Sequence, residues 1–182
     1  MRNLFLTAAA AASLSACAAP GIGPGGKLPL QPPPMGVPHN AVEYMMLAAS
    51  GDLLEIQTAQ LLLQRGRNPQ LRGYAQQMIE HHTRLSAALM AAARQGGVAP
   101  PPPRMLNRHA NMLNLLAGEG PDTFELSYLR MQLVAHNEAL LVHGAYAAAG
   151  ENPALKAAAA AAAPVITGHL QQARVLGMPL TP

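Results

Sequence analysis

Residues 68–97 read NPQLRGYAQQMIEHHTRLSAALMAAARQGG, and this stretch decides the fold class. Its apolar residues recur every three or four positions, a period that is typical of an amphipathic α-helix and not of a strand. Asn68 and Pro69 signal a helix start, because asparagine caps free backbone N–H groups and proline fits the first turn. Gly96 and Gly97 are typical of a helix end. The stretch therefore predicts one long helix.

The same pattern recurs on both sides of this stretch, and no segment alternates as a half-buried strand would. Three more long helices are expected. The first is expected to start at Asn40 with Glu43 and to end at Gly66. The others are expected to start at Asp122 with Glu125 and at Asn152 with Pro153, and to end at Gly150 and Gly177. The sequence therefore predicts an all-α domain.

The connection between the second and third long helices is long for a compact domain, and it holds prolines 100–103 and a short amphipathic stretch over 105–116. A connection of this length can run along a bundle and return the chain to its other end, as the crossover of ferritin-like bundles does. We therefore predict a ferritin-like four-helix bundle made of two antiparallel hairpins, joined by a long crossover that contains a short helix.

Composition excludes some classes of function. The 182 residues carry a formal charge of only +3, with four Tyr, two Phe and no Trp. This is too weak a positive field, and too few stacking side chains, for a nucleic-acid partner. The single cysteine, Cys17, also excludes an intrachain disulfide and any cysteine-based zinc or iron–sulfur site.

The N-terminus has the pattern of a targeting segment. Residues 1–16 show a positive start, an apolar run and small residues before Cys17, as a signal peptide does. Leu14-Ser15-Ala16-Cys17 resembles the lipobox of bacterial lipoproteins, which implies cleavage before Cys17 and acylation of that cysteine. The membrane is then a partner through the N-terminal lipid. Since Ala18 and not Asp follows, the resemblance favours the outer membrane, facing the periplasm. The alternative is an ordinary secretory leader that is cut later.

Residues 17–38 are rich in proline and glycine and cannot bury a core, so we interpret them as the acylated cysteine and a tether. The helical domain is then expected over residues 39–182.

One ionisable residue lies on the predicted buried face of each long helix. These residues are Glu55, His82, His136 and His169, while His81 lies on the flank of its helix. Counted from the hairpin turns, they fall within ~5 Å of one another along the bundle axis. Three imidazoles and a carboxylate at one level predict a mononuclear site for one divalent metal ion, Zn²⁺, Cu²⁺ or Fe²⁺.

Other interpretations of these residues remain. A hydrogen-bonded cluster of the same four side chains would set the register of the helices and bind nothing. The ten methionines suggest copper, although methionine at helical spacing more often fills core gaps. No Glu-x-x-His motif occurs, which argues against a di-iron centre. No nucleophile elbow or phosphate loop occurs either, so the sequence does not favour an enzymatic function.

Several short motifs together resemble a known family. They are GDLLEI over 51–56, YAQQMIEHH over 74–82, FELSY over 124–128 leading to His136, and Pro164 with His169-Leu170. They are similar to the ferritin-like domain of unknown function of bacterial secreted and lipid-anchored proteins, often labelled predicted outer membrane proteins. That family usually has Asp where this chain has His81 and Glu125. The resemblance implies a ferritin-like fold and a place outside the cytoplasm, and no established activity.

Together these observations predict an envelope lipoprotein whose bundle binds a metal ion for storage, buffering or stress protection. The alternative is a metal-free structural or interaction module of the cell envelope, and a metal-dependent oxidoreductase comes third.

Overall fold

A computed structural model describes residues 37, 38 and 40–177 of the chain. Within these residues the protein forms five α-helices and no strand: α1 (Ala41–Arg65), α2 (Pro69–Gln95), α3 (Asn107–Ala117), α4 (Phe124–Ala149) and α5 (Pro153–Gly177). The all-α prediction is confirmed. The predicted signal peptide over 1–16, the lipidation site Cys17 and nearly all of the tether over 17–38 lie outside the described residues.

The helices begin where asparagine side chains can accept hydrogen bonds from free backbone N–H groups. Asn40 accepts a bond from the N–H of Glu43 at 2.8 Å, and Asn68 accepts one from the N–H of Gln70 at 2.9 Å. Asn152 accepts one from Leu155 at 3.2 Å at the start of α5. These three starts follow from local capping chemistry, which is why the sequence predicts them.

The prediction that Asp122 and Glu125 cap the start of α4 is wrong. The helix begins at Phe124 after Thr123, whose side chain makes no capping bond, and Asp122 does not cap it. Glu125 instead accepts hydrogen bonds from the backbone N–H groups of Arg67 and Asn68, at 2.5 and 2.8 Å. This carboxylate therefore ties the start of α4 to the turn between α1 and α2.

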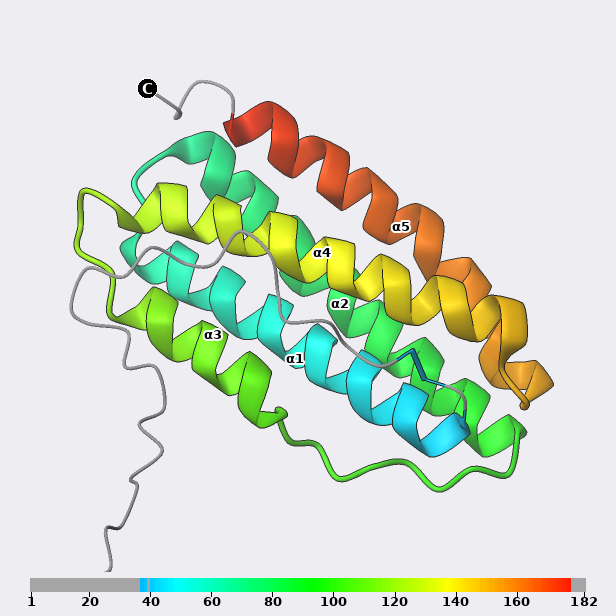
Figure 1. The fold of residues 1–182 in the computed structure, drawn as a ribbon. Helices are drawn as coiled ribbons and strands as arrows, with labels where there is room; N and C mark the ends of the chain where they lie inside the picture. The colour runs from blue at the N-terminus through cyan, green and yellow to red at the C-terminus, as the bar shows by residue number, and fades with distance from the viewer. Residues whose placement is uncertain (1–36, 39, 178–182) are drawn as a thin grey trace, which may run out of the picture.

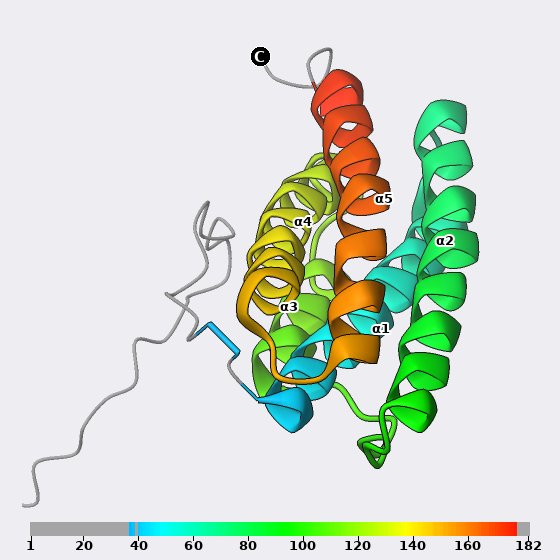
Figure 2. The ribbon, with the colours of Figure 1, turned by 90° about the vertical axis from the view of Figure 1, so that its right-hand side faces the viewer.

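The chain forms two antiparallel hairpins, α1 with α2 and α4 with α5 (Figure 1). From the end of α2 the crossover runs along the outside of α1, and α3 returns the chain to the end of the bundle where α1 stops. As a result α4 runs antiparallel to α1, against which it packs, and α5 lies between α4 and α2 (Figure 2). The predicted ferritin-like arrangement of two hairpins and a crossover is confirmed.

The apolar core is divided into two parts along the bundle. One part lies toward the α1–α2 turn and includes Leu62, Leu71 and Tyr128. The other lies toward the opposite end and includes Tyr44 and Leu155. Buried polar side chains occupy the level between them. A buried polar group without a hydrogen-bond partner destabilises the fold, so the partners of the side chains at this level indicate whether they form a structural network or a binding site.

In the described part of the chain, no helix is both long enough and apolar enough to cross a membrane.

Candidate metal centre

Three imidazoles from three helices meet between the two apolar parts of the core. They belong to His82 of α2, His136 of α4 and His169 of α5, and none is more than 2% exposed. The ring centroids lie 5.3 to 5.6 Å apart in all three pairs. One ligand nitrogen from each ring lies within 4.8 Å of the other two. We call this group the three-histidine cluster.

One nitrogen of each ring is hydrogen-bonded to a neighbouring group. The Nδ1 atom of His82 lies 2.8 Å from Oδ1 of Asp52. The Nδ1–H of His136 donates to the carbonyl oxygen of Gln132 at 2.8 Å, and Nε2 of His169 lies 2.8 Å from Nδ1 of His81. Such outer contacts set the orientation and the tautomer of a histidine that binds a metal.

The other nitrogen of each ring has no partner. His82 Nε2, His136 Nε2 and His169 Nδ1 are all buried and accept or donate no hydrogen bond. Leaving a buried polar atom unpaired costs ~1–3 kcal/mol, so three such atoms in one cluster require an explanation. Neutral imidazole nitrogens with their rings held from behind are the donor set that Zn²⁺ and Cu²⁺ prefer.

The charge states of two of the three rings suit this donor set. Burial and the neighbouring His82 lower the pKa of His136 to about 3, and burial together with His82 and His81 lowers the pKa of His169 to about 3. Both rings are therefore neutral near pH 7 and keep a free lone pair. Burial also lowers the pKa of His82, but the hydrogen bond and the charge of Asp52 outweigh it and raise that pKa overall.

Glu55 lies beside the cluster and not in the group of three ligand atoms. Its Oε1 atom is 3.3 Å from Nδ1 of His136, the nitrogen that already donates to Gln132. The side chain is 3% exposed, neither carboxylate oxygen has a hydrogen-bond partner, and burial raises its pKa to about 7. Of the four predicted ligands, the structure thus brings three together and places the fourth against one of them.

A pocket between α1 and α4 reaches this level of the bundle. Its polar lining comprises Asp52, Glu55, His82, His109, Glu138 and His143. Half-buried small and apolar residues, Leu47, Gly51 and Ala139, also line it. The pocket therefore connects a polar interior, including one member of the three-histidine cluster, with the side of the bundle.

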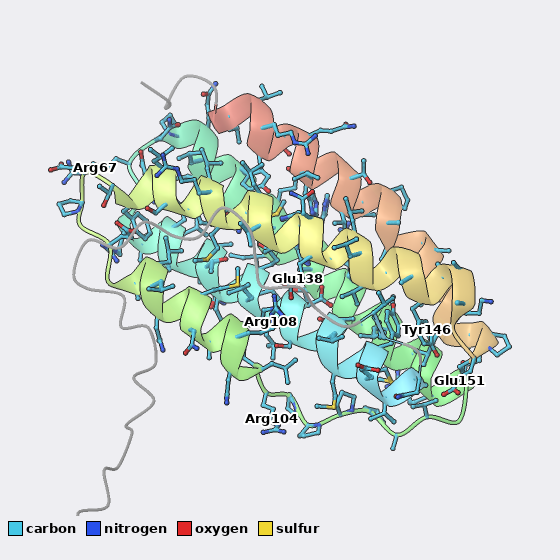
Figure 3. All side chains as sticks on the ribbon, in the orientation of Figure 1. Arg67, Arg104, Arg108, Glu138, Tyr146 and Glu151 are labelled. Carbon is cyan, nitrogen blue, oxygen red and sulfur yellow. The ribbon has the colours of Figure 1, made fainter. Side chains whose placement is uncertain are left out.

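A second buried polar group lies where α3 covers α1 and α4. His109 Nδ1 lies 2.6 Å from the hydroxyl oxygen of Ser50, and His109 Nε2 lies 2.7 Å from Oε1 of Glu138. Arg108 donates to Oε2 of Glu138 at 2.5 Å, and Figure 3 shows these two side chains together between α3 and α4. We call Ser50, Arg108, His109 and Glu138 the α3 cluster.

Comparison with known proteins assigns the chain to a family. Residues 29–176 match the family model described as "Domain of unknown function (DUF4142)", and this match covers most of the chain and all of α1 to α4. The protein belongs to the DUF4142 family. The family predicted from the short motifs, a ferritin-like domain of unknown function, is thereby confirmed.

The DUF4142 fold is also similar to a solved structure, "CopM in the Cu(II)-bound form". The two chains are 17% identical, the match covers 78% of this chain and 98% of CopM, and the TM-score is 0.66. At this identity the likeness shows a shared helical fold. No curated protein matches the sequence.

The prediction of one buried ionisable residue per long helix is wrong for this DUF4142 domain. In addition to the predicted residues, α1 buries Asp52, and α4 buries Glu138 and His143. Asp52 precedes Glu55 by three residues, so helical periodicity places both on one face, and the sequence carried this signal. No sequence pattern signals that His81 pairs with His169, because that contact depends on how α2 and α5 cross.

Proposed function

We propose that this protein binds one divalent metal ion through His82, His136 and His169, at the cell envelope, for storage, buffering or protection against metal stress. One observation carries the proposal: each of the three buried rings keeps one nitrogen without a hydrogen-bond partner, while a neighbour holds the other. In a purely structural network, three buried nitrogens without hydrogen-bond partners would only destabilise the fold.

The donor set and the structural likeness favour Cu²⁺. Imidazole nitrogen binds Cu²⁺ more strongly than the other common divalent ions of the first transition row. The similar fold of CopM was solved in a Cu(II)-bound form. Zn²⁺ and Fe²⁺ are the competing ions. Met78 lies in the apolar part of the core, in agreement with methionine as a packing residue.

Two carboxylates next to the histidines offset the charge of a bound cation. Asp52 holds His82 through its Oδ1 atom, and Glu55 lies 3.3 Å from Nδ1 of His136. A buried cation requires such compensation, since desolvating a charge without a counter-charge is strongly unfavourable. Asp52 and Glu55 are therefore proposed to assist the three histidines, with Glu55 as the charge-balancing carboxylate.

The proposed location follows from residues 14–17, whose sequence LSAC resembles a lipobox. Acylation of Cys17 would anchor the chain to the outer membrane, facing the periplasm, with the residues up to Pro38 as a spacer. Labelling of cells with a radioactive fatty acid should mark the wild-type protein and leave Cys17→Ser unmarked. Equal labelling of both would refute the anchor and leave the metal proposal untouched.

The metal proposal is tested by the metal content of the purified protein, produced without a metal-binding tag, beside a Glu55→Ala/His136→Ala double variant. The wild-type protein is expected to take up about one ion per chain and to melt at a higher temperature when loaded, because a ligand that binds only the native state stabilises it. The double variant is expected to take up none.

A metal-free structural module is the second candidate function. The contacts of Asp52 with His82 and of Glu55 with His136 connect α1 to α2 and α1 to α4, which is how a polar core would set helix register. If wild-type protein and double variant take up no Cu²⁺, Zn²⁺ or Fe²⁺, the metal proposal is wrong and this module is the function to study.

A further inference from the structure

The three histidines are almost fully buried, so an ion needs a path through the bundle to reach them. The pocket between α1 and α4 is lined by small residues where the two helices approach, namely Ala48, Gly51, Ala135 and Ala139. At Gly51 there is room for a side chain, since an added Cβ atom would meet no other atom within 4 Å. A larger side chain at one of these four positions would narrow the pocket.

The carboxylates of this pocket differ in what they already bind. Both oxygens of Asp52 are engaged, by His82 at 2.8 Å and by Ser86 at 2.8 Å. Both oxygens of Glu138 are engaged by His109 and Arg108. Glu55 is buried in the same pocket with both oxygens unpartnered. It is thus the carboxylate of this pocket that is free to receive a cation.

Glu55 also links the pocket to the histidines. It shares the pocket lining with His82, and its Oε1 atom is in contact with His136. A cation that enters beside Gly51 would therefore find, in the same pocket as His82, a carboxylate that has no hydrogen-bond partner. Negative groups in a cleft with low-dielectric walls raise the local concentration of cations and the rate at which they enter.

We propose that the pocket between α1 and α4 is the entry path of the metal ion, and that Glu55 receives the ion at its inner end and passes it to the three-histidine cluster. This inference rests on the proposed function, because it needs a metal site to deliver to. The entry path also gives a reason for the glycine at position 51. Glycine inside a helix is less favourable than alanine, so the helix alone does not explain why Gly51 stands there.

The test measures the rate at which the purified protein takes up Cu²⁺, followed by stopped-flow absorbance, in wild type and three variants. Gly51→Leu fills the pocket, and Glu55→Gln keeps the shape of the side chain and removes its charge. Gly73→Leu is the matched control, because Gly73 is an exposed glycine of α2 that also has free space around it. Melting temperatures of the metal-free proteins confirm that each variant folds.

Gly51→Leu and Glu55→Gln are each expected to slow uptake by about tenfold or more, while Gly73→Leu takes up the ion at the wild-type rate. Gly51→Leu should reach the wild-type ion content at long times, since it removes no ligand. If Gly51→Leu and Glu55→Gln both keep the wild-type rate, the ion enters elsewhere and this inference is wrong. If wild type itself takes up no ion, the proposed function fails, and the two failures are thereby distinguished.

Discussion

The three-histidine cluster and the α3 cluster use similar side chains and are similarly buried, yet they differ in how many of their atoms have partners. In the α3 cluster both ring nitrogens of His109 and both carboxylate oxygens of Glu138 are hydrogen-bonded, and one buried atom, Nε of Arg108, has no partner. In the three-histidine cluster each ring has one nitrogen bonded and one free. Burial and residue type therefore do not distinguish the two clusters, whereas the number of buried atoms without a hydrogen-bond partner does, and this difference supports the metal site proposed at the three-histidine cluster.

The difference also follows the elements that supply the residues. The α3 cluster fastens a helix of the crossover to α1 and α4, and its bonds are expected to stabilise the fold. The three-histidine cluster joins α2, α4 and α5 at a level where both apolar parts of the core end. A variant that breaks one cluster should therefore leave the other intact.

The largest effect is expected from His136→Ala. Removing one of three nitrogen ligands should lower the affinity for Cu²⁺ by more than about 100-fold, beyond the loss that an outer contact causes. His109→Ala, the corresponding change in the α3 cluster, should leave the affinity of the folded protein unchanged. Titration against a competing chelator measures both constants. A His136→Ala protein that binds like wild type would remove His136 from the site.

Glu138→Ala should have the largest effect on stability. It leaves His109 and Arg108 without their shared acceptor, and breaking a buried pair of this kind costs ~3 kcal/mol or more. Glu80→Ala is the control, because Glu80 pairs with Arg84 on the exposed surface of α2, where such a pair contributes less than about 0.5 kcal/mol. Urea unfolding of the metal-free proteins compares them. Equal losses in both variants would show that the α3 cluster does not stabilise the fold.

Asp52→Asn is expected to weaken Cu²⁺ binding by about 10- to 100-fold without removing a ligand, because Asp52 orients His82 and increases the basicity of its free nitrogen. Ser86→Ala removes only the hydroxyl that donates to the other oxygen of Asp52, and it should weaken binding less. The same chelator titration applies. If Asp52→Asn binds as tightly as wild type, the orienting role is wrong.

The effect of pH on stability concerns His143, which lies outside both clusters and bonds to the hydroxyl group of Tyr44. Burial lowers the pKa of His143 to about 4, while in the unfolded chain the pKa is near 6.5. Between these values the unfolded state binds the proton and the folded state does not, so stability falls as the pH drops. At pH 5 this group should cost the metal-free protein about 2 kcal/mol relative to pH 7.5.

His143→Gln removes that titration, and the free energy of unfolding should then fall less steeply between pH 7.5 and pH 5 than in wild type. Urea unfolding at several pH values measures the two slopes. Parallel slopes would show that His143 takes up its proton equally well in the folded protein.

Much of the fold was predictable because its signals are local. Asn40, Asn68 and Asn152 cap helices through contacts with residues two or three positions away, and the sequence contains both partners. The start of α4 was assigned to the wrong chemistry, because Glu125 bonds to the distant turn at Arg67 and not to its own helix. The rule of local capping fails where a side chain has a better partner elsewhere in the fold.

Helical periodicity by itself determined that His82, His136 and His169 lie inward and at one level, because the direction of a side chain and the rise along a helix depend only on position in the helix. Only the tertiary structure decided which nitrogen of each ring is held and which is free, that Glu55 contacts His136 from the side, and that Asp52 and His81 support the rings. These contacts depend on how α1, α2, α4 and α5 cross, because a hydrogen bond forms only within a narrow range of donor–acceptor distances. No periodicity within a single helix contains that information.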